Sequence, residues 1–124
     1  MTPFDFVDYL ALADTLASQP DGAAWRTSIS RSYYAVLHAA YQALPAAHRI
    51  AISYGATHRA TWNLYVVSSV PGCRQVGNAG LRLRDGGVNA DYRATPPVVR
   101  AEAIRMVAYA RQSLERLQLY GYQP

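Results

Sequence analysis

One long stretch of the chain carries almost no charge, and this limits what the protein can fold into. Between Thr27 and Ala47 the only formally charged side chain is Arg31, and most other residues are alanine, serine, tyrosine, leucine, isoleucine or valine. A helix on a protein surface normally shows one polar face, and this stretch shows none. We therefore predict a helix over about residues 23–44 that is either central in the fold or covered by a partner.

Helical spacing of apolar residues continues along the rest of the chain, and no segment alternates with a period of two for long enough to form a strand. Proline and glycine separate the periodic segments. The sequence therefore predicts an all-α fold, an antiparallel bundle of four to five helices in one domain spanning residues 1–124. The other expected elements are a first helix capped by Thr2, helices over 57–70 and 73–84, a loop at Asp85-Gly86-Gly87, and a last helix from Thr95 to Gly121.

The composition excludes several classes of protein. The chain has 124 residues, and with 51% of them apolar it is long enough for one core. No apolar run approaches the roughly 18 residues of a membrane span, and no export signal opens the chain, so we expect a cytoplasmic protein with no membrane contact. The single cysteine, Cys73, excludes an internal disulfide, and the histidines and carboxylates show no metal-ligand spacing. We expect neither a metal nor a cofactor.

Charge is distributed unevenly along the chain. Residues 1–25 contain four aspartates and no basic residue, whereas all 12 basic residues follow, and all are arginines. An excess of positive charge in one region often indicates a partner with negative charge, nucleic acid first among them. An acidic first helix packed on a basic body would give the same distribution, so charge alone leaves both interpretations open.

Two polar residues interrupt the apolar stretch. Arg31 and His38 are seven residues apart, which places them within about 20° of each other on one side of a helix. A guanidinium group binds phosphate through two contacts, and an imidazole exchanges a proton near neutral pH. Together they are a minimal set for cleaving RNA without a metal. A structural interpretation stands beside this one, in which His38 is a hydrogen-bonded core histidine and Arg31 pairs with a carboxylate such as Asp91.

Three segments resemble one family of domains. The sequence from Arg31 to His38 resembles the HEPN motif of an arginine, four to six residues and a histidine, and the segment Tyr33–Ala35 is typical of its small single-domain prokaryotic branch. The segment Thr57–Ala60 resembles the Ser/Thr-His start of the family's third helix. The segment Asn89–Ala94 resembles the Ala-Asp-Tyr segment before the last helix. The three segments occur in the family's order.

The resemblance implies a fold, a partner and an activity. HEPN domains are helical and form homodimers through the second helix, where two Arg/His pairs make a composite cleft. Active members are metal-independent endoribonucleases, many of them toxins paired with a nucleotidyltransferase-like antitoxin, and others serve antiviral defence. By motif position Arg31 and His38 would be catalytic, and the other residues expected to lie at the RNA cleft are Ser32, Tyr34, Tyr41, Arg82 or Arg84, Asp91 and Tyr92.

A second class of function remains open. Some HEPN domains are inactive and bind a nucleotidyltransferase or a larger defence complex. Ser32 and Gly87 occupy positions where active members often carry other residues, which favours this interaction module, whereas the presence of both Arg31 and His38 favours catalysis. His58, which starts a predicted helix, could face the cleft, but a polar surface is the favoured interpretation for a histidine at a helix start.

Overall fold

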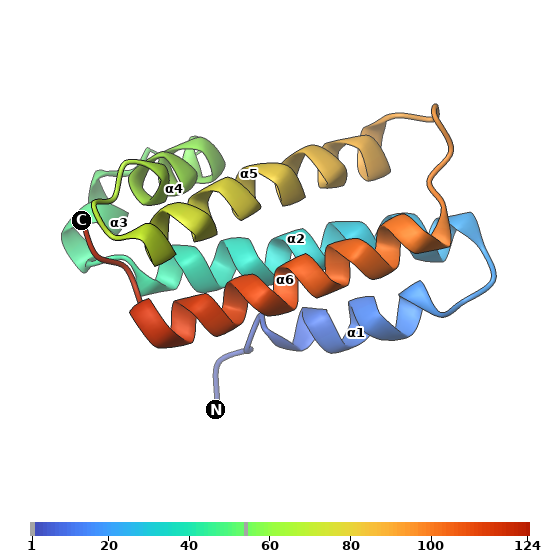
Figure 1. Ribbon diagram of the computed structural model, residues 1–124, viewed down its shortest axis with the longest axis horizontal. Helices are drawn as coiled ribbons and strands as arrows, with labels where there is room; N and C mark the ends of the chain where they lie inside the picture. The colour runs from blue at the N-terminus through green and yellow to red at the C-terminus, as the bar shows by residue number, and fades with distance from the viewer. Residues whose placement is uncertain (1, 54) are drawn as a thin grey trace.

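The structure is a computed structural model that describes residues 2–53 and 55–124, and its helices form one elongated bundle (Figure 1). The all-α class is confirmed, since the described residues hold helices and no strand. A short helix forms between the segments predicted as helices over 23–44 and 57–70, so the described residues hold six helices. Their bounds are α1 Asp8–Ala17, α2 Gly22–Ala43, α3 Ala46–Ala51, α4 Thr57–Val66, α5 Pro71–Tyr92 and α6 Arg100–Tyr120.

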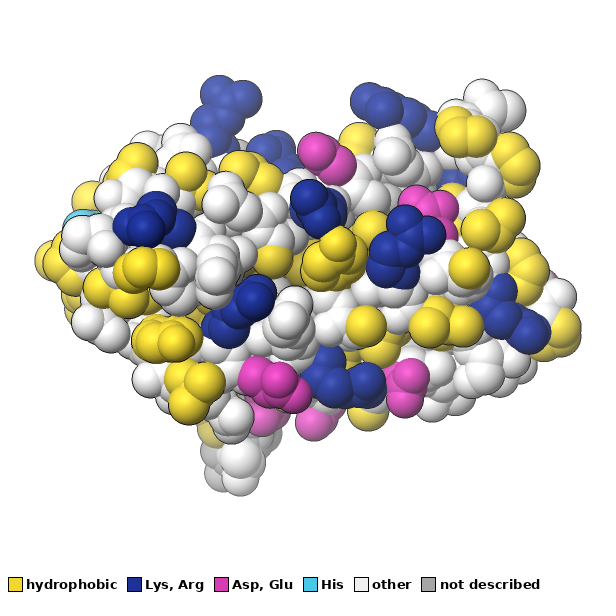
Figure 2. Space-filling model, viewed as in Figure 1, with side chains coloured by type: hydrophobic (Ala, Val, Ile, Leu, Met, Phe, Trp, Pro, Cys, Tyr) yellow, Lys and Arg dark blue, Asp and Glu magenta, His cyan; other side chains and the backbone are white. Residues whose placement is uncertain are grey.

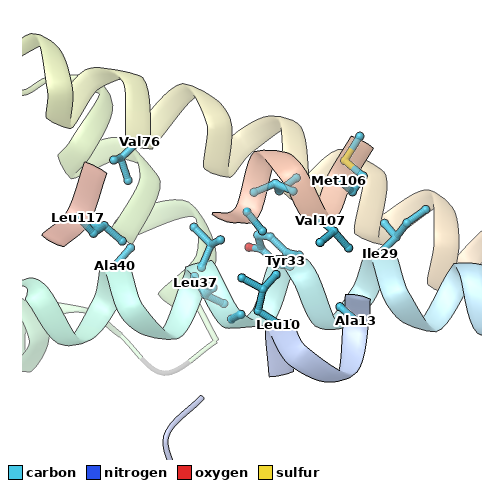
Figure 3. Close-up of a cluster of buried hydrophobic side chains, with 14 of the residues drawn as sticks. Leu10, Ala13, Ile29, Tyr33, Leu37, Ala40, Val76, Met106, Val107 and Leu117 are labelled. Atoms are coloured by element: carbon cyan, nitrogen blue, oxygen red, sulfur yellow. The ribbon is translucent and has the colours of Figure 1, made fainter. Parts of the chain in front are cut away.

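The central helix of the bundle is α2. It packs against α1, α5 and α6 along its length and against α4 on a further side (Figure 1). Ile29, Tyr33 and Ala40 are buried at helical spacing along α2 (Figure 3), and Val36 is buried on the same helix. Contacts within one chain therefore explain most of the apolar character of α2, and its composition does not by itself require a partner.

A single long helix, α5, replaces the predicted helix and loop. The predicted loop at Asp85-Gly86-Gly87 is wrong, because these residues lie inside α5. Both glycines are buried at helix crossings. A Cβ atom at Gly86 would lie 3.3 Å from the sulfur of Met106, and one at Gly87 would lie 3.6 Å from the ring of Tyr33. In this helix, glycine allows neighbouring helices to come close and does not mark a turn.

The two terminal helices begin later than predicted. Helix α1 begins at Asp8 and not after Thr2, and the preceding segment folds back as a small aromatic cluster of Phe4, Phe6 and Tyr9. Helix α6 begins at Arg100 and not after Thr95, whereas its predicted end is confirmed at Gly121, which has a φ of 57°. No helix among the residues described is long and apolar enough to cross a membrane.

Arg26 joins the start of α2 to the end of α5. Its guanidinium donates hydrogen bonds to four backbone carbonyls, those of Asn89, Ala90, Arg93 and Ala94, at 2.7–3.3 Å. The last carbonyls of a helix have no partner within the helix, and a nearby positive charge stabilises them. This contact holds the end of α5 against α2.

Candidate functional site

Arg31 lies between two tyrosine rings on the surface of α2. Its guanidinium carbon is 4.8 Å from the ring centre of Tyr34 and 4.9 Å from that of Tyr9 on α1. Its Nη2 atom donates a hydrogen bond of 3.1 Å to Ser30 Oγ. These contacts fix the side chain on the same side of α2 as Tyr34.

The carboxylate pairing proposed for Arg31 is not seen. Within the described residues the ion pair is a different one, between Arg111 and Asp14 at 3.7 Å. Asp91 nevertheless lies close by, because Ser30 Oγ donates to Asp91 Oδ2 at 3.2 Å. Arg31 is therefore connected to Asp91 through Ser30, and its charge is not neutralised by direct contact with a described carboxylate.

His38 is half-buried and stacks on Phe6 from the segment before α1. The ring centres are 3.6 Å apart and the ring planes differ by 15°. Burial, and then the nearby charges of His58 and Arg31, lower the pKa of His38 from its ordinary value. Its imidazole is therefore neutral at pH 7, the form that accepts a proton. Neither ring nitrogen has a hydrogen bond within the described residues, so His38 is not the hydrogen-bonded core histidine of the structural interpretation.

A cavity of about 210 Å³ opens beside these residues, between α2, α4 and α5. Four residues expected at the cleft line it, and they come from different helices: Tyr34 from α2, and Arg84, Asp91 and Tyr92 from α5. Tyr92 is 81% exposed, so it lies at the mouth. The remaining lining residues are Tyr33, His58, Gly87 and Val88.

Sequence analysis misplaced His58. It is half-buried and lines the cavity, where its Nδ1 lies 2.6 Å from the hydroxyl of Tyr33. The same hydroxyl accepts a hydrogen bond of 3.1 Å from Nε1 of the buried Trp62. The prediction of a solvated histidine failed because a helix start is usually exposed, and only the packing of α4 against α2 and α5 shows that this one is not.

Five residues expected at the cleft do not line the cavity: the two catalytic candidates on α2, Arg31 and His38, and three others. Ser32 is fully buried, and its hydroxyl has no hydrogen-bond partner in the described part of the chain. Tyr41 is half-buried against the core. Arg82 faces α6, where it donates to the hydroxyl of Tyr109 at 2.6 Å. Of the two arginines that matched the motif, Arg84 is therefore the one at the cavity.

No group of three or more possible metal ligands occurs among the residues described. Comparison of the chain with models of protein families, with curated proteins and with solved structures found no match to any of them.

Proposed function

We propose that the protein is a metal-independent endoribonuclease of the toxin or antiviral type, related to HEPN domains. One observation carries the proposal. Arg31, without a described carboxylate partner, and His38, held neutral by burial, lie on one side of α2. Phosphate binding by arginine and proton transfer by histidine are the two functions that RNA transesterification requires.

The proposed reaction needs only these groups and the ribose. Neutral His38 accepts the proton of the 2′-hydroxyl, and the 2′-oxygen attacks the neighbouring phosphorus. Arg31 stabilises the charge on the non-bridging oxygens. The bond from phosphorus to the 5′-oxygen breaks, and the proton taken up by His38 passes to that oxygen. The products are a 2′,3′-cyclic phosphate and a 5′-hydroxyl, and His38 is neutral again. DNA lacks the nucleophile and is not cut.

The proposal includes a homodimer through α2, in which the Arg31 and His38 pairs of the two copies form one composite cleft. Most of α2 is covered within one chain, so the surface left for a second copy is the side that bears Arg31, Tyr34, His38 and Tyr41, all half-buried. Sedimentation or light scattering of the purified protein tests this part: a monomer at the concentrations used for cleavage would contradict the composite site.

The decisive experiment is cleavage of single-stranded RNA by purified protein in EDTA. We expect His38→Ala to lower the rate by a factor of roughly 10²–10⁴, the usual contribution of a general acid or base. Arg31→Lys also fails, because an ammonium group lacks the planar two-point contact with phosphate. Arg82→Ala is the matched control, since it removes one positive charge on the side of α5 that faces α6. Equal rates in all four proteins would contradict the proposal.

A second candidate is a non-catalytic module that binds a nucleotidyltransferase-like antitoxin or a larger defence complex. This candidate is favoured because aromatic rings cover both residues of the motif. Phe6 stacks on one face of His38, and Arg31 lies between Tyr9 and Tyr34. Deleting residues 2–7 distinguishes the two. Cleavage that persists or increases supports the nuclease, whereas an inactive protein that co-purifies with the nucleotidyltransferase through Arg31 supports the module.

A further inference from the structure

The cavity beside Arg31 contains polar groups that the proposed cleavage step does not use. His58 lies near enough to Arg84 to feel its charge, whereas Asp91 is seven residues beyond Arg84 on α5, about 10 Å further along the helix. Tyr34 and Tyr92 also line the cavity. Tyr33 and Gly87 are the buried residues of the lining, and the other lining residues are half-buried or exposed. The polar side chains of the lining are therefore available to bind a ligand that carries polar or charged groups.

A chain of hydrogen bonds determines which proton His58 presents to this cavity. The indole nitrogen of Trp62 is only a donor, so the hydroxyl oxygen of Tyr33 accepts from it. The hydroxyl proton of Tyr33 is then free to be donated to Nδ1 of His58, which lies 2.6 Å away. Burial raises the pKa of Tyr33 to about 12, so the hydroxyl keeps that proton. A neutral His58 whose Nδ1 accepts must carry its own proton on Nε2.

Arg84 adds a second donor at the same place. It lines the cavity with His58, and its positive charge acts together with burial to lower the pKa of that histidine, so the imidazole is neutral. Within residues 2–53 and 55–124, the guanidinium of Arg84 has no hydrogen bond or ion pair, although the side chain is half-buried. An uncompensated guanidinium beside an N–H donor provides donors and positive charge but no acceptor. This combination matches a phosphate oxygen.

Asp91 adds negative charge and hydrogen-bond acceptors to the cavity, in contrast to the donors of His58 and Arg84. One carboxylate oxygen accepts from Ser30 Oγ at 3.2 Å, and the other has no partner among the described residues. A carboxylate repels phosphate but accepts from hydroxyl and amino groups. An occupant that satisfies both kinds of group has an anionic group and, at some distance from it, hydroxyl or amino donors. The tyrosine rings suit a flat aromatic group.

We propose that this cavity binds one nucleotide, with its phosphate on Arg84 and on Nε2–H of His58, its sugar or base donors on Asp91, and its base against Tyr34 or Tyr92. The inference rests on the proposed function only in taking the natural ligand to be a nucleotide of an RNA strand next to the one that is cut. The site itself is a feature of a single chain, so a mononucleotide tests it without any cleavage.

The experiment measures the binding of adenosine 5′-monophosphate to the full chain by NMR with ¹⁵N-labelled histidine. In the free protein we expect His58 to show a protonated Nε2 and an unprotonated Nδ1. Addition of the nucleotide should shift Nε2 of His58 and leave His48, which lies against Tyr122, unchanged. Arg84→Ala should weaken binding roughly ten- to a hundredfold, the range expected for loss of a charge-assisted hydrogen bond. Arg82→Ala, with the same change of charge, should leave the affinity unchanged.

Two outcomes of the binding experiment would overturn the inference. Equal weakening by Arg84→Ala and Arg82→Ala would show that binding depends on total charge alone. Inorganic phosphate that binds as tightly as the nucleotide would remove the roles of Asp91 and the tyrosines. Melting curves of both variants confirm that they are folded. A protein that binds the nucleotide through Arg84 but leaves RNA intact would disprove the nuclease and keep the site. If RNA cleavage needs Arg31 and His38 but nucleotide binding does not change in Arg84→Ala, the nuclease is supported and the proposed nucleotide site is disproved.

Discussion

Two arginines of α5 stand two residues apart and have different surroundings. Arg82 is exposed, stacks on the ring of Tyr109 at 5.3 Å and donates to its hydroxyl. Arg84 is half-buried, lines the cavity beside His58 and has no hydrogen bond within the described residues. Two residues correspond to a rotation of about 200° around a helix, so the two side chains face different helices.

The comparison shows that the sequence motif alone does not determine which of the two arginines is available to bind a ligand. Both arginines fit the sequence pattern equally well, and their residue type is identical. What separates them is the neighbouring helix, since α6 offers Arg82 a tyrosine hydroxyl whereas α2 and α4 offer Arg84 a cavity. A charged group without a partner is a candidate for binding a ligand, and one already bound to the protein is a candidate for stability.

The largest expected effect concerns two glycines of the same helix. A Cβ at Gly80 would overlap the ring of the buried Trp62, whereas one at Gly87 would meet Tyr33 at ordinary contact distance. We expect Gly80→Ala to destabilise the protein by about 3 kcal/mol, the upper end of the usual effect of overpacking. Gly87→Ala should stabilise it by up to about 1 kcal/mol, because alanine favours the helix. Urea denaturation measures both, and similar changes of the same sign would contradict the packing described for α5.

The second prediction compares two variants that each lose a tyrosine hydroxyl, one on α2 and one on α6. Tyr33→Phe leaves the buried indole N–H of Trp62 without its acceptor, which we expect to cost about 2 kcal/mol. Tyr109→Phe removes the partner of an exposed arginine and should cost less than about 0.5 kcal/mol. Thermal unfolding compares the two variants. A Tyr33→Phe protein as stable as the Tyr109→Phe protein would show that the hydrogen-bond chain to His58 is not formed.

The third prediction concerns the dependence of stability on pH, which should follow the titration of two half-buried histidines. Burial lowers the pKa of both His38 and His58 below the unfolded value of 6.5, so folding favours their neutral forms. Their contribution to stability is complete above that value and is lost as the pH falls below it. We expect the urea midpoint to fall between about pH 7 and pH 5.5, where histidine titrates. The fall should be smaller in a His38→Gln/His58→Gln variant and unchanged in Tyr109→Phe.

The smallest expected effect separates the two arginines themselves. Arg82→Ala loses a cation–π contact and a hydrogen bond on an exposed surface and should lower stability by about 0.5–1 kcal/mol. Arg84→Ala loses no described hydrogen bond and removes a positive charge near the half-buried His58, so its stability should stay within about 0.5 kcal/mol of the parent. Calorimetry of both proteins without nucleotide is the measurement. A reversed order would contradict the assignment of Arg82 to structure and Arg84 to binding.

Helical periodicity was sufficient to predict the all-α class, and the lack of charge over 27–47 was sufficient to predict a helix that is central or covered. Both patterns follow from burial in a helical bundle, and Ile29, Tyr33 and Val36 of this helix are buried. The predicted loop at 85–87 was wrong because the sequence does not show that Met106 and Tyr33 approach α5 at Gly86 and Gly87. A small residue is needed there inside the helix. The start of α1 was misread for a related reason: the phenylalanines before it pack on one another and on His38 and do not continue the helix.

Part of the candidate site could be predicted because it lies within one helix. The seven-residue spacing of Arg31 and His38 fixes their common side of α2 with no knowledge of the tertiary structure. His58 could not be placed this way, since its surroundings come from Tyr33, 25 residues earlier, and from Arg84 on α5. Ser32 was wrongly assigned to the cleft because it neighbours Arg31 in sequence, whereas on the helix it turns toward the interior.

The contact of Arg26 with the end of α5 also determines how a ligand reaches the cavity. Four carbonyls at that end are bound to one guanidinium from α2, so the wall that bears Asp91 and Tyr92 does not separate from the wall that bears Tyr34 unless these bonds break together. The exposed ring of Tyr92 at the mouth is free to rotate. Access therefore depends on side-chain rotation, which takes picoseconds to nanoseconds, and not on the far slower separation of helices. Nucleotide exchange at this site is expected to be limited by diffusion and affinity, with no opening step of the protein.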